Sequence, residues 1–336
     1  FVNRDGAAGD VVYGERELLD IIHRSPQLRL KMPSLLALDR TRFAPERSTF
    51  DVEAARELAR VFVATPAWHR ALAVLREYHF AVLTGPPEMG KTAIARMLGL
   101  ALMGDGWEVH ETIRPEQVWE RLDRHRPQLF IADDAFGSTE YRPDAADDWA
   151  SDLERILRAV DADHWLLWTS RPAPLRAGLR RLHRQSGIPA PASVLVDAAA
   201  LGPEEKTLIL FRHARAADLA PEARAVIRNC GSAIVSHPHF TPERIRRLVA
   251  RCPAEGDIEA AIEAELSKPT EAMAASYRAL APEDRELLIA MVDSPPGPVA
   301  ERDLVEALRR HAANGLPRAP VDLVERLRDH FLKVLS

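Results

Sequence analysis

The 336-residue sequence predicts an α/β fold in which helices cover both faces of a parallel sheet. Two observations support this fold class. Short apolar runs typical of buried strands recur at residues 80–85 ("FAVLTG"), 129–134 ("LFIADD") and 164–171 ("HWLLWTSR"), and helical segments separate them. After about residue 200 the pattern changes to amphipathic helices alone, several with a proline near the start. A helical unit is therefore expected to follow the sheet.

Changes of pattern divide the chain into four expected parts. Residues 1–50 are irregular and interrupted by prolines, with one short strand and one helix, and would be the tail of an N-terminal domain plus a linker. Residues 51–200 hold the sheet, and residues 201–268 form a helical lid. Residues 269–336 resemble the opening helices of a winged-helix domain. Because the chain begins at Phe1 and stops on an apolar helix, we expect it to be a piece of a longer protein.

Composition excludes several classes of partner. Hydrophobic residues make up 46% and charged residues 28%, and no apolar run approaches the roughly 20 residues that cross a membrane. A net charge of -5 offers no general attraction to nucleic acid. The two cysteines cannot form a disulfide framework or a zinc site by themselves. We therefore expect a cytoplasmic protein without a membrane partner.

The segment "GPPEMGKT", which follows the first apolar run, matches the phosphate-binding pattern G-x-x-x-x-G-K-[ST] at every fixed position. Glycines let backbone amides turn inward around phosphate oxygens, and the following helix adds the positive end of its dipole. The alternative is a structural, proline-rich turn. The residues expected to contact nucleotide are Gly85, Pro86, Pro87, Glu88, Met89, Gly90, Lys91, Thr92 and Ala93.

Such a loop requires a metal and an acidic partner. Lys91 is expected to reach the β- and γ-phosphates of ATP or ADP, and the Thr92 hydroxyl to ligate Mg²⁺. Asp133 and Asp134 end the second apolar run, where a carboxylate would meet the metal. We assign Asp133 to the metal shell and Asp134 to orienting or deprotonating the attacking water. The alternative reading is an aspartate pair that caps a turn.

The motifs in their order along the chain resemble a known family. A phosphate-binding loop, a strand ending in Asp-Asp, a strand ending in Thr-Ser-Arg and a trailing helical and winged-helix region resemble the STAND NTPases, which are relatives of AAA+ ATPases. More narrowly, "LFIADDAFGSTEYRP", "LLWTSRPAPLRAGL", "EKTLILFRHA" and "HPHFTPERIRRL" resemble the novel STAND NTPase 3 (nSTAND3) group. The resemblance covers roughly residues 55–336.

This resemblance implies a nucleotide-operated switch. Relatives in bacterial antiphage defence couple such a module to an effector domain, so effector and sensor domains are expected outside this chain, with homo-oligomers on activation. Most related ATPases have glutamate where Asp134 stands, and the shorter side chain suggests slow hydrolysis.

The resemblance also assigns three further site residues. Arg171 would read the γ-phosphate, or alternatively cap a strand end on the surface. Pro242 would pack near adenine and Arg244 would sense phosphate from the lid. Because Glu243 separates Pro242 from the arginines, Arg246 and Arg247 remain alternatives to Arg244.

Three alternatives remain open. The N-terminal piece resembles the tail of a restriction-endonuclease-like domain, or it is a strand and helix packed on the NTPase. The chain could be a DNA-associated AAA+ ATPase of the loader or initiator type that uses its winged helix. However, "VDLVERLRDHFLKVL" mixes acidic and basic residues, so DNA binding by this chain is not expected. A small-molecule kinase would need an acceptor pocket for which no residues are evident.

Overall fold

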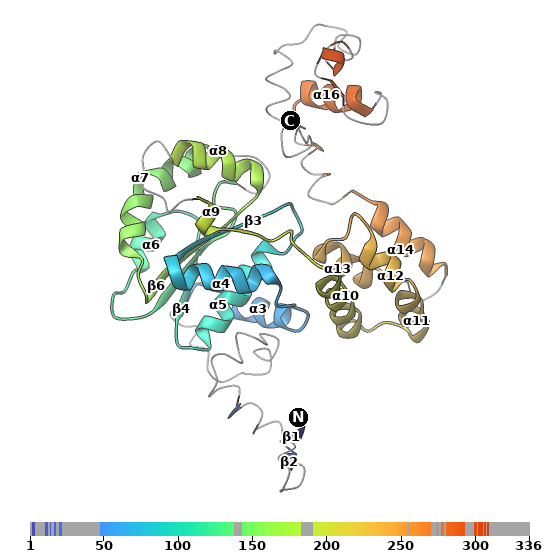
Figure 1. The fold of residues 1–336 in the computed structure, drawn as a ribbon, viewed down its shortest axis with the longest axis horizontal. Coiled ribbons are helices and arrows are strands. Elements are labelled where there is room, and N and C mark those ends of the chain that lie inside the picture. The colour runs from blue at the N-terminus through green and yellow to red at the C-terminus, as the bar shows by residue number, and fades with distance from the viewer. Residues whose placement is uncertain are drawn as a thin grey trace.

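The computed structural model describes residues 48–137, 143–182, 191–253, 256–269 and 280–292, with scattered residues toward both ends. The described residues form a sheet domain and, beside it, a group of helices over residues 203–267, which we call the helical unit (Figure 1). Each of these two parts has its own cluster of buried apolar side chains.

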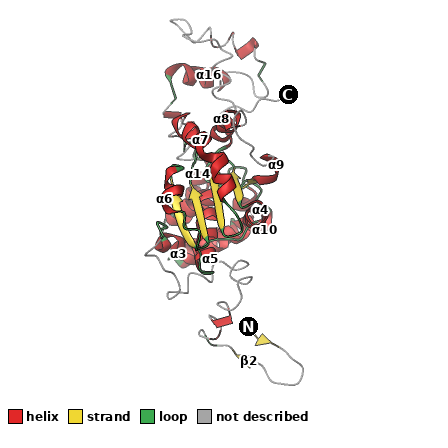
Figure 2. Cartoon of the chain, turned by 90° about the vertical axis from the view of Figure 1, so that its left-hand side faces the viewer, coloured by secondary structure: helices red, strands yellow, loops and turns green. Residues whose placement is uncertain are grey.

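The sheet has five parallel strands in the order β4-β5-β6-β3-β7. Their bounds are β3 (Phe80–Thr84), β4 (Glu108–Thr112), β5 (Gln128–Ala132), β6 (His164–Ser170) and β7 (Leu195–Asp197). The predicted parallel α/β sheet is thus confirmed, and the strands lie side by side between helices in Figure 2. The sequence did not reveal β4, an edge strand with alternating polar residues, or β7, which has three residues.

The helices of the sheet domain are α3 (Val52–Ala59), α4 (Pro66–Tyr78), α5 (Lys91–Met103), α6 (Glu116–Arg121), α7 (Pro143–Ala159), α8 (Pro172–Leu182) and α9 (Pro191–Val194). Trp168 of β6 is fully buried and makes edge-on contacts with Phe80, Phe136 and Trp149, with ring centroids 5.0 to 5.1 Å apart. Burial on both faces explains why β6 reads as a continuous apolar run.

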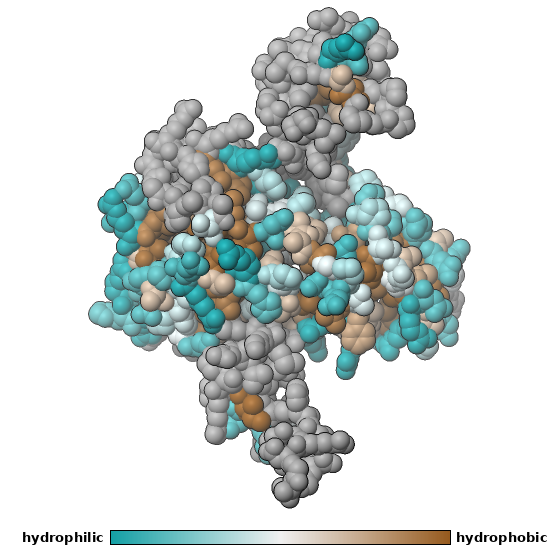
Figure 3. All heavy atoms as spheres, viewed as in Figure 1, coloured by the Kyte–Doolittle hydropathy of each residue, from teal (hydrophilic) through white to brown (hydrophobic). Residues whose placement is uncertain are grey.

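The helical unit consists of α10 (Pro203–Ala216), α11 (Pro221–Asn229), α12 (Gly231–Ser236), α13 (Pro242–Ala250) and α14 (Ile258–Ser267). Proline is the first residue of α10, α11 and α13, where its missing amide costs nothing. Val63, from the segment between α3 and α4, packs into the core of this unit. On the face drawn in Figure 3, hydrophilic residues cover much of the unit and hydrophobic ones show between them.

Only fragments of the two ends are described. β1 (Val2–Asn3) pairs antiparallel with β2 (Val11–Val12), and α16 (Pro282–Val292) packs in a small apolar cluster with Leu304 and Leu308. Most residues of the predicted N-terminal tail and winged-helix segment lie outside the described residues, so both remain predictions. In the described part of the chain, no helix is long and apolar enough to cross a membrane.

Candidate nucleotide-binding site

The sheet order brings the predicted catalytic residues to one edge. β6 lies between β5 and β3, so the carboxyl ends of these three strands are neighbours. Asp133 and Asp134 follow β5, Arg171 follows β6, and the loop Gly85–Thr92 follows β3. In parallel α/β sheets this edge is where ligands bind, because the loops there leave a crevice.

The loop from β3 into α5 has the backbone that a phosphate cradle needs. Gly85 and Gly90 have φ of 146° and 86°, which glycine adopts without strain. A Cβ atom on Gly85 would lie 3.4 Å from both Ala199 N and Asp197 Oδ1, so a larger residue would crowd the next loop. Gly90 is the N-cap of α5 and provides no side-chain cap, which leaves the first amides of α5 facing the loop.

The Lys91 amine lies inside this loop. Its Nζ donates hydrogen bonds to the carbonyl oxygens of Gly85 at 2.8 Å and Pro86 at 2.9 Å, and the residue is 7% exposed. Burial lowers the pKa of Lys91 from 10.5 to about 8, although Asp134 and Asp133 act in the opposite direction. The loop therefore encloses a buried amine that an anion would stabilise in its charged form.

Thr92 and Asp133 lie together, as the metal assignment requires. The Thr92 hydroxyl donates to the Asp133 carboxylate, with its Oγ1 3.0 Å from Oδ1 and 3.1 Å from Oδ2. Thr169 of β6 donates to Asp133 Oδ1 at 2.5 Å and accepts from the Asp134 amide at 2.9 Å. Thr169 thus contacts the carboxylate of Asp133 and the backbone of Asp134. Sequence analysis missed this role although it singled out the Thr-Ser-Arg motif.

The charged groups of Asp134, Arg171 and Lys91 interact electrostatically with one another. Burial raises the pKa of Asp134, and the neighbouring Asp133 raises it further, while Arg171 and Lys91 lower it. Arg171 Nη1 is buried and has no hydrogen-bond partner among the described residues. A buried guanidinium nitrogen without a partner is costly unless a ligand satisfies it, so this atom fits the expected phosphate.

Asp197 is a further acidic residue at this edge, and sequence analysis did not identify it. It ends β7, its Oδ1 accepts from the Ala199 amide at 2.8 Å, and its charge raises the pKa of Lys91. The reason it was missed is local: β7 is too short to read as a strand, so nothing marked Asp197 as a strand end.

The helical unit reaches the loop through one of the three arginines left open above. Pro242 is the first residue of α13. Arg244 Nη1 donates to the carbonyl oxygens of Glu265, Leu266 and Lys268 at 2.6 to 2.8 Å, so this side chain points toward the end of α14. The phosphate contact predicted for Arg244 is therefore untested.

Of the other two arginines, Arg247 is the one whose described contacts reach the loop. Arg246 forms an ion pair with Glu243 of its own helix, with Nη2 and Oε1 2.6 Å apart. Arg247 donates to the carboxylate of Glu88, at 2.8 Å from Nη1 and 3.1 Å from Nη2. This contact joins α13 to the centre of the phosphate-binding loop.

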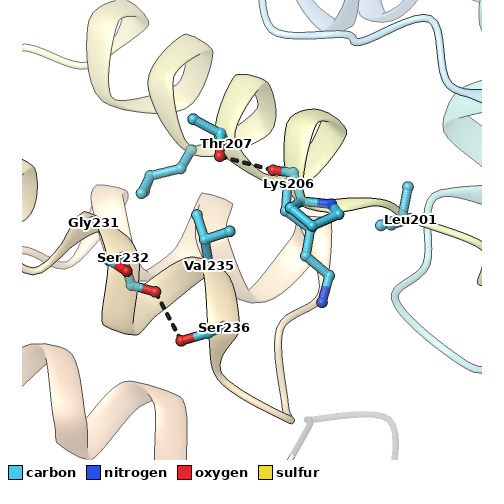
Figure 4. A pocket seen from close by; sticks show the side chains of 9 residues that line it. Leu201, Lys206, Thr207, Gly231, Ser232, Val235 and Ser236 are labelled. Carbon is cyan, nitrogen blue, oxygen red and sulfur yellow. Dashed lines mark hydrogen bonds between the residues drawn. The ribbon is translucent and has the colours of Figure 1, made fainter.

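A hollow of about 580 Å³ lies within the helical unit. Figure 4 shows it between α10 and α12, with Val235 of α12 pointing toward α10. The hydroxyls of Thr207 and Ser236 donate to backbone carbonyls of their own helices, at 2.7 and 2.8 Å. None of the predicted nucleotide contacts lines this hollow, but its Lys206 provides a control lysine for the experiments below.

The buried amine predicts a pH dependence of stability. With a folded pKa of about 8 and an ordinary value of 10.5, the unfolded chain binds more protons between these values, so stability rises with pH there. Below pH 8 the cost of burying the charge is present in full. Lys91→Met should therefore stabilise the nucleotide-free protein at pH 7 by at most about 3 kcal/mol, and less as the pH rises toward 10.

Urea unfolding of the wild type, Lys91→Met and Lys206→Met between pH 7 and 10 measures this effect. The Lys206 variant should follow the wild type at each pH. Parallel curves for the wild type and Lys91→Met would contradict a depressed pKa for the Lys91 amine.

Comparison with known proteins gives a family for this part of the chain. Residues 62–216 match the family model described as Novel STAND NTPase 3. Among solved structures, a Walker-type ATPase of Pyrococcus abyssi aligns with 12% identity and a TM-score of 0.47, covering 80% of this chain and 89% of that one. RuvB of Thermotoga maritima aligns with 16% identity and a TM-score of 0.40, covering 78% and 84%.

A third similar structure is the Orc1 protein of Aeropyrum pernix in complex with DNA, with 17% identity and a TM-score of 0.43, covering 78% of this chain and 81% of that one. Curated proteins gave no significant match.

Proposed function

We propose, from the match of residues 62–216 to the Novel STAND NTPase 3 family model, that the chain is a switch that binds and slowly hydrolyses ATP. The proposal rests on three groups that lie at one edge of the sheet. They are the Lys91 amine inside the loop, the hydrogen-bonded oxygens of Thr92 and Asp133, and the buried Arg171 Nη1, which has no partner among the described residues. Together they supply cations for phosphate and hard oxygen ligands for a divalent metal.

The residues divide into binding and catalytic roles. The glycine-bearing loop and Lys91 hold the β- and γ-phosphates, and Arg171 contacts the γ-phosphate from the sheet. Thr92 and Asp133 are the residues that would hold Mg²⁺, which when bound neutralises phosphate charge. Asp134 accepts the proton of the attacking water, because burial and the charge of Asp133 raise its pKa and thus its affinity for a proton.

We propose that the helical unit is a lid whose position depends on the nucleotide. Contacts that connect it to the sheet domain include Val63 in its core, the hydrogen bond from Arg212 to the Phe62 carbonyl, and the pairing of Arg247 with Glu88 of the loop. Pro242 would lie near adenine, at the start of α13. A ligand shifts the equilibrium between two lid positions only if its affinity for them differs. A nucleotide phosphate bound beside Glu88 would lie next to the Glu88–Arg247 contact, so its affinity would depend on the position of the lid.

In its cell the switch would couple nucleotide exchange to homo-oligomerisation and to an effector domain outside this chain. We propose bacterial antiphage defence in the cytoplasm as the setting, on the strength of the family resemblance. The alternative, a DNA-associated ATPase, depends on a recognition helix within residues 321–336, which lie outside the described residues. A salt titration of duplex DNA binding tests it, since phosphate contacts make affinity fall steeply with salt.

Scattering measurements test the switch. With ADP the chain should be compact and monomeric, whereas a non-hydrolysable ATP analogue should reposition the lid, change the radius of gyration and promote association. Light scattering gives the mass and small-angle scattering the radius, with Lys91→Ala as the variant that should not respond. An identical mass and radius with both nucleotides would favour an ordinary ATPase.

A further inference from the structure

Glu88 is an unusual residue for the centre of a phosphate-binding loop. Its φ is 66°, a left-handed conformation that glycine adopts freely and that other residues avoid. Its side chain is nevertheless only 7% exposed. A buried carboxylate on a disfavoured backbone implies that the side chain has partners that a glycine could not provide.

Those partners come from α13 and its N-cap. Arg247 donates to both carboxylate oxygens of Glu88, and the Thr241 hydroxyl donates to Oε2 at 3.2 Å. The Glu243 amide approaches the Glu88 carbonyl at 3.5 Å. These contacts between the loop and the helical unit all involve Glu88, although Glu88 and Arg247 are 159 residues apart in the chain.

Arg247 is held on two sides by acidic groups. Its side chain is 6% exposed, and its Nε donates to Glu265 Oε1 of α14 at 3.3 Å. Hydrogen bonding to Glu88 raises the pKa of the Arg247 guanidinium above its usual range. Without Glu88, Arg247 would keep Glu265 as a partner of its Nε, but its two buried Nη groups would lose their carboxylate, so an anion at this position is favoured.

Phosphate is the other anion that the loop is built to hold. Glu88 is the fourth residue of the loop, three residues before Lys91, so the anion that Arg247 requires is provided within the phosphate cradle itself. A phosphate with a bidentate pair of oxygens satisfies a guanidinium as well as a carboxylate does. A carboxylate and a phosphate cannot both occupy the same face of one guanidinium.

We propose that Glu88 is a positioning residue that competes with the terminal phosphate of ATP for Arg247. In the nucleotide-free chain, Glu88 holds Arg247 and keeps α13 against the loop. ATP transfers Arg247 from Glu88 to the γ-phosphate, and this exchange of partners repositions the helical unit. ADP lacks the terminal phosphate and leaves the Glu88–Arg247 pair in place. The inference rests on the proposed nucleotide switch and names the contact that the switch changes.

Nucleotide affinities test the competition. Glu88→Gln keeps the shape of the side chain and weakens its hold on Arg247, so it should tighten binding of a non-hydrolysable ATP analogue about tenfold and change ADP binding by less than about twofold. In an Arg247→Gln background, the Glu88→Gln change should have no effect. Glu88→Gly, which also relieves the backbone, should act in the same direction as Glu88→Gln.

Glu263→Gln is the matched control, because its carboxylate accepts only from Ser267 of its own helix among the described contacts, at 3.2 Å. Equal changes for ADP and the ATP analogue, or weaker analogue binding by Glu88→Gln, would show that the pair is only a structural brace and would overturn the proposal.

Hydrogen exchange separates this proposal from the nucleotide function itself. Without any nucleotide, Glu88→Gln should increase amide exchange over residues 242–250, whereas Glu263→Gln should not. Unchanged exchange there would overturn the Glu88–Arg247 pair as the contact that holds α13, even if ATP binds. If the wild-type protein bound no nucleotide, the proposed function would be wrong. The exchange experiment would still test whether the Glu88–Arg247 pair holds α13.

Discussion

Lys91→Ala is expected to abolish the stabilisation of the folded chain by ATP. The Lys91 amine is enclosed by the phosphate-binding loop and hydrogen-bonds to two of its carbonyl oxygens, so its removal takes away the cation nearest the expected phosphates. At a hundred times its dissociation constant, Mg-ATP should stabilise the wild type by about 2.7 kcal/mol, and the variant by nothing measurable. Thermal unfolding with and without Mg-ATP measures both values.

Lys206→Ala is the matched control for this experiment. Lys206 lies on α10 at the hollow within the helical unit, where it is 5.3 Å from the Phe240 ring centroid. Its variant should keep the full response to Mg-ATP. If the wild type itself shows no shift at saturating Mg-ATP, the proposed nucleotide site is wrong.

Asp134→Asn is expected to bind Mg-ATP within about twofold of the wild type but to hydrolyse it about 10²- to 10⁴-fold more slowly. Asparagine keeps the shape and tolerates the φ of 48° at this position, so the change removes the proton acceptor without straining the backbone. Single-turnover hydrolysis and equilibrium binding measure the two properties separately.

Asp133→Asn should behave differently, because its carboxylate accepts from Thr92 and Thr169 and belongs to the proposed metal shell. Magnesium-dependent binding should weaken about 10- to 100-fold in addition to the loss of hydrolysis. Asp123→Asn, near the opposite end of β5, provides the control, since its described side-chain contacts are local: Oδ1 accepts from the His125 amide at 2.9 Å and Oδ2 lies 3.4 Å from Arg126 Nε. Equal effects of the Asp133 and Asp134 changes on both properties would contradict the division of roles.

Much of the site could be predicted because its parts are contiguous in sequence or stand at strand ends. The loop pattern places Gly85, Gly90 and Lys91 within eight residues, so local geometry is enough to imply a phosphate cradle. Asp133 and Arg171 follow apolar runs, and parallel strands present their carboxyl ends at one edge. The missed residues lack such signals: Thr169 reads as part of a buried strand, and Asp197 follows a strand of three residues.

By itself, therefore, the sequence determined the fold class, the phosphate-binding loop and the acidic strand end, because periodicity and short motifs are properties of neighbouring residues. Only the tertiary structure decided which arginine of the helical unit contacts the loop. Arg244 and Arg247 are one helical turn apart in the same helix, yet Arg244 bonds the end of α14 and Arg247 bonds Glu88. That choice depends on how α13 packs against α14 and the loop. Contacts between segments so distant in the chain leave no periodic pattern in the sequence, because they depend on how the helices pack against one another in three dimensions.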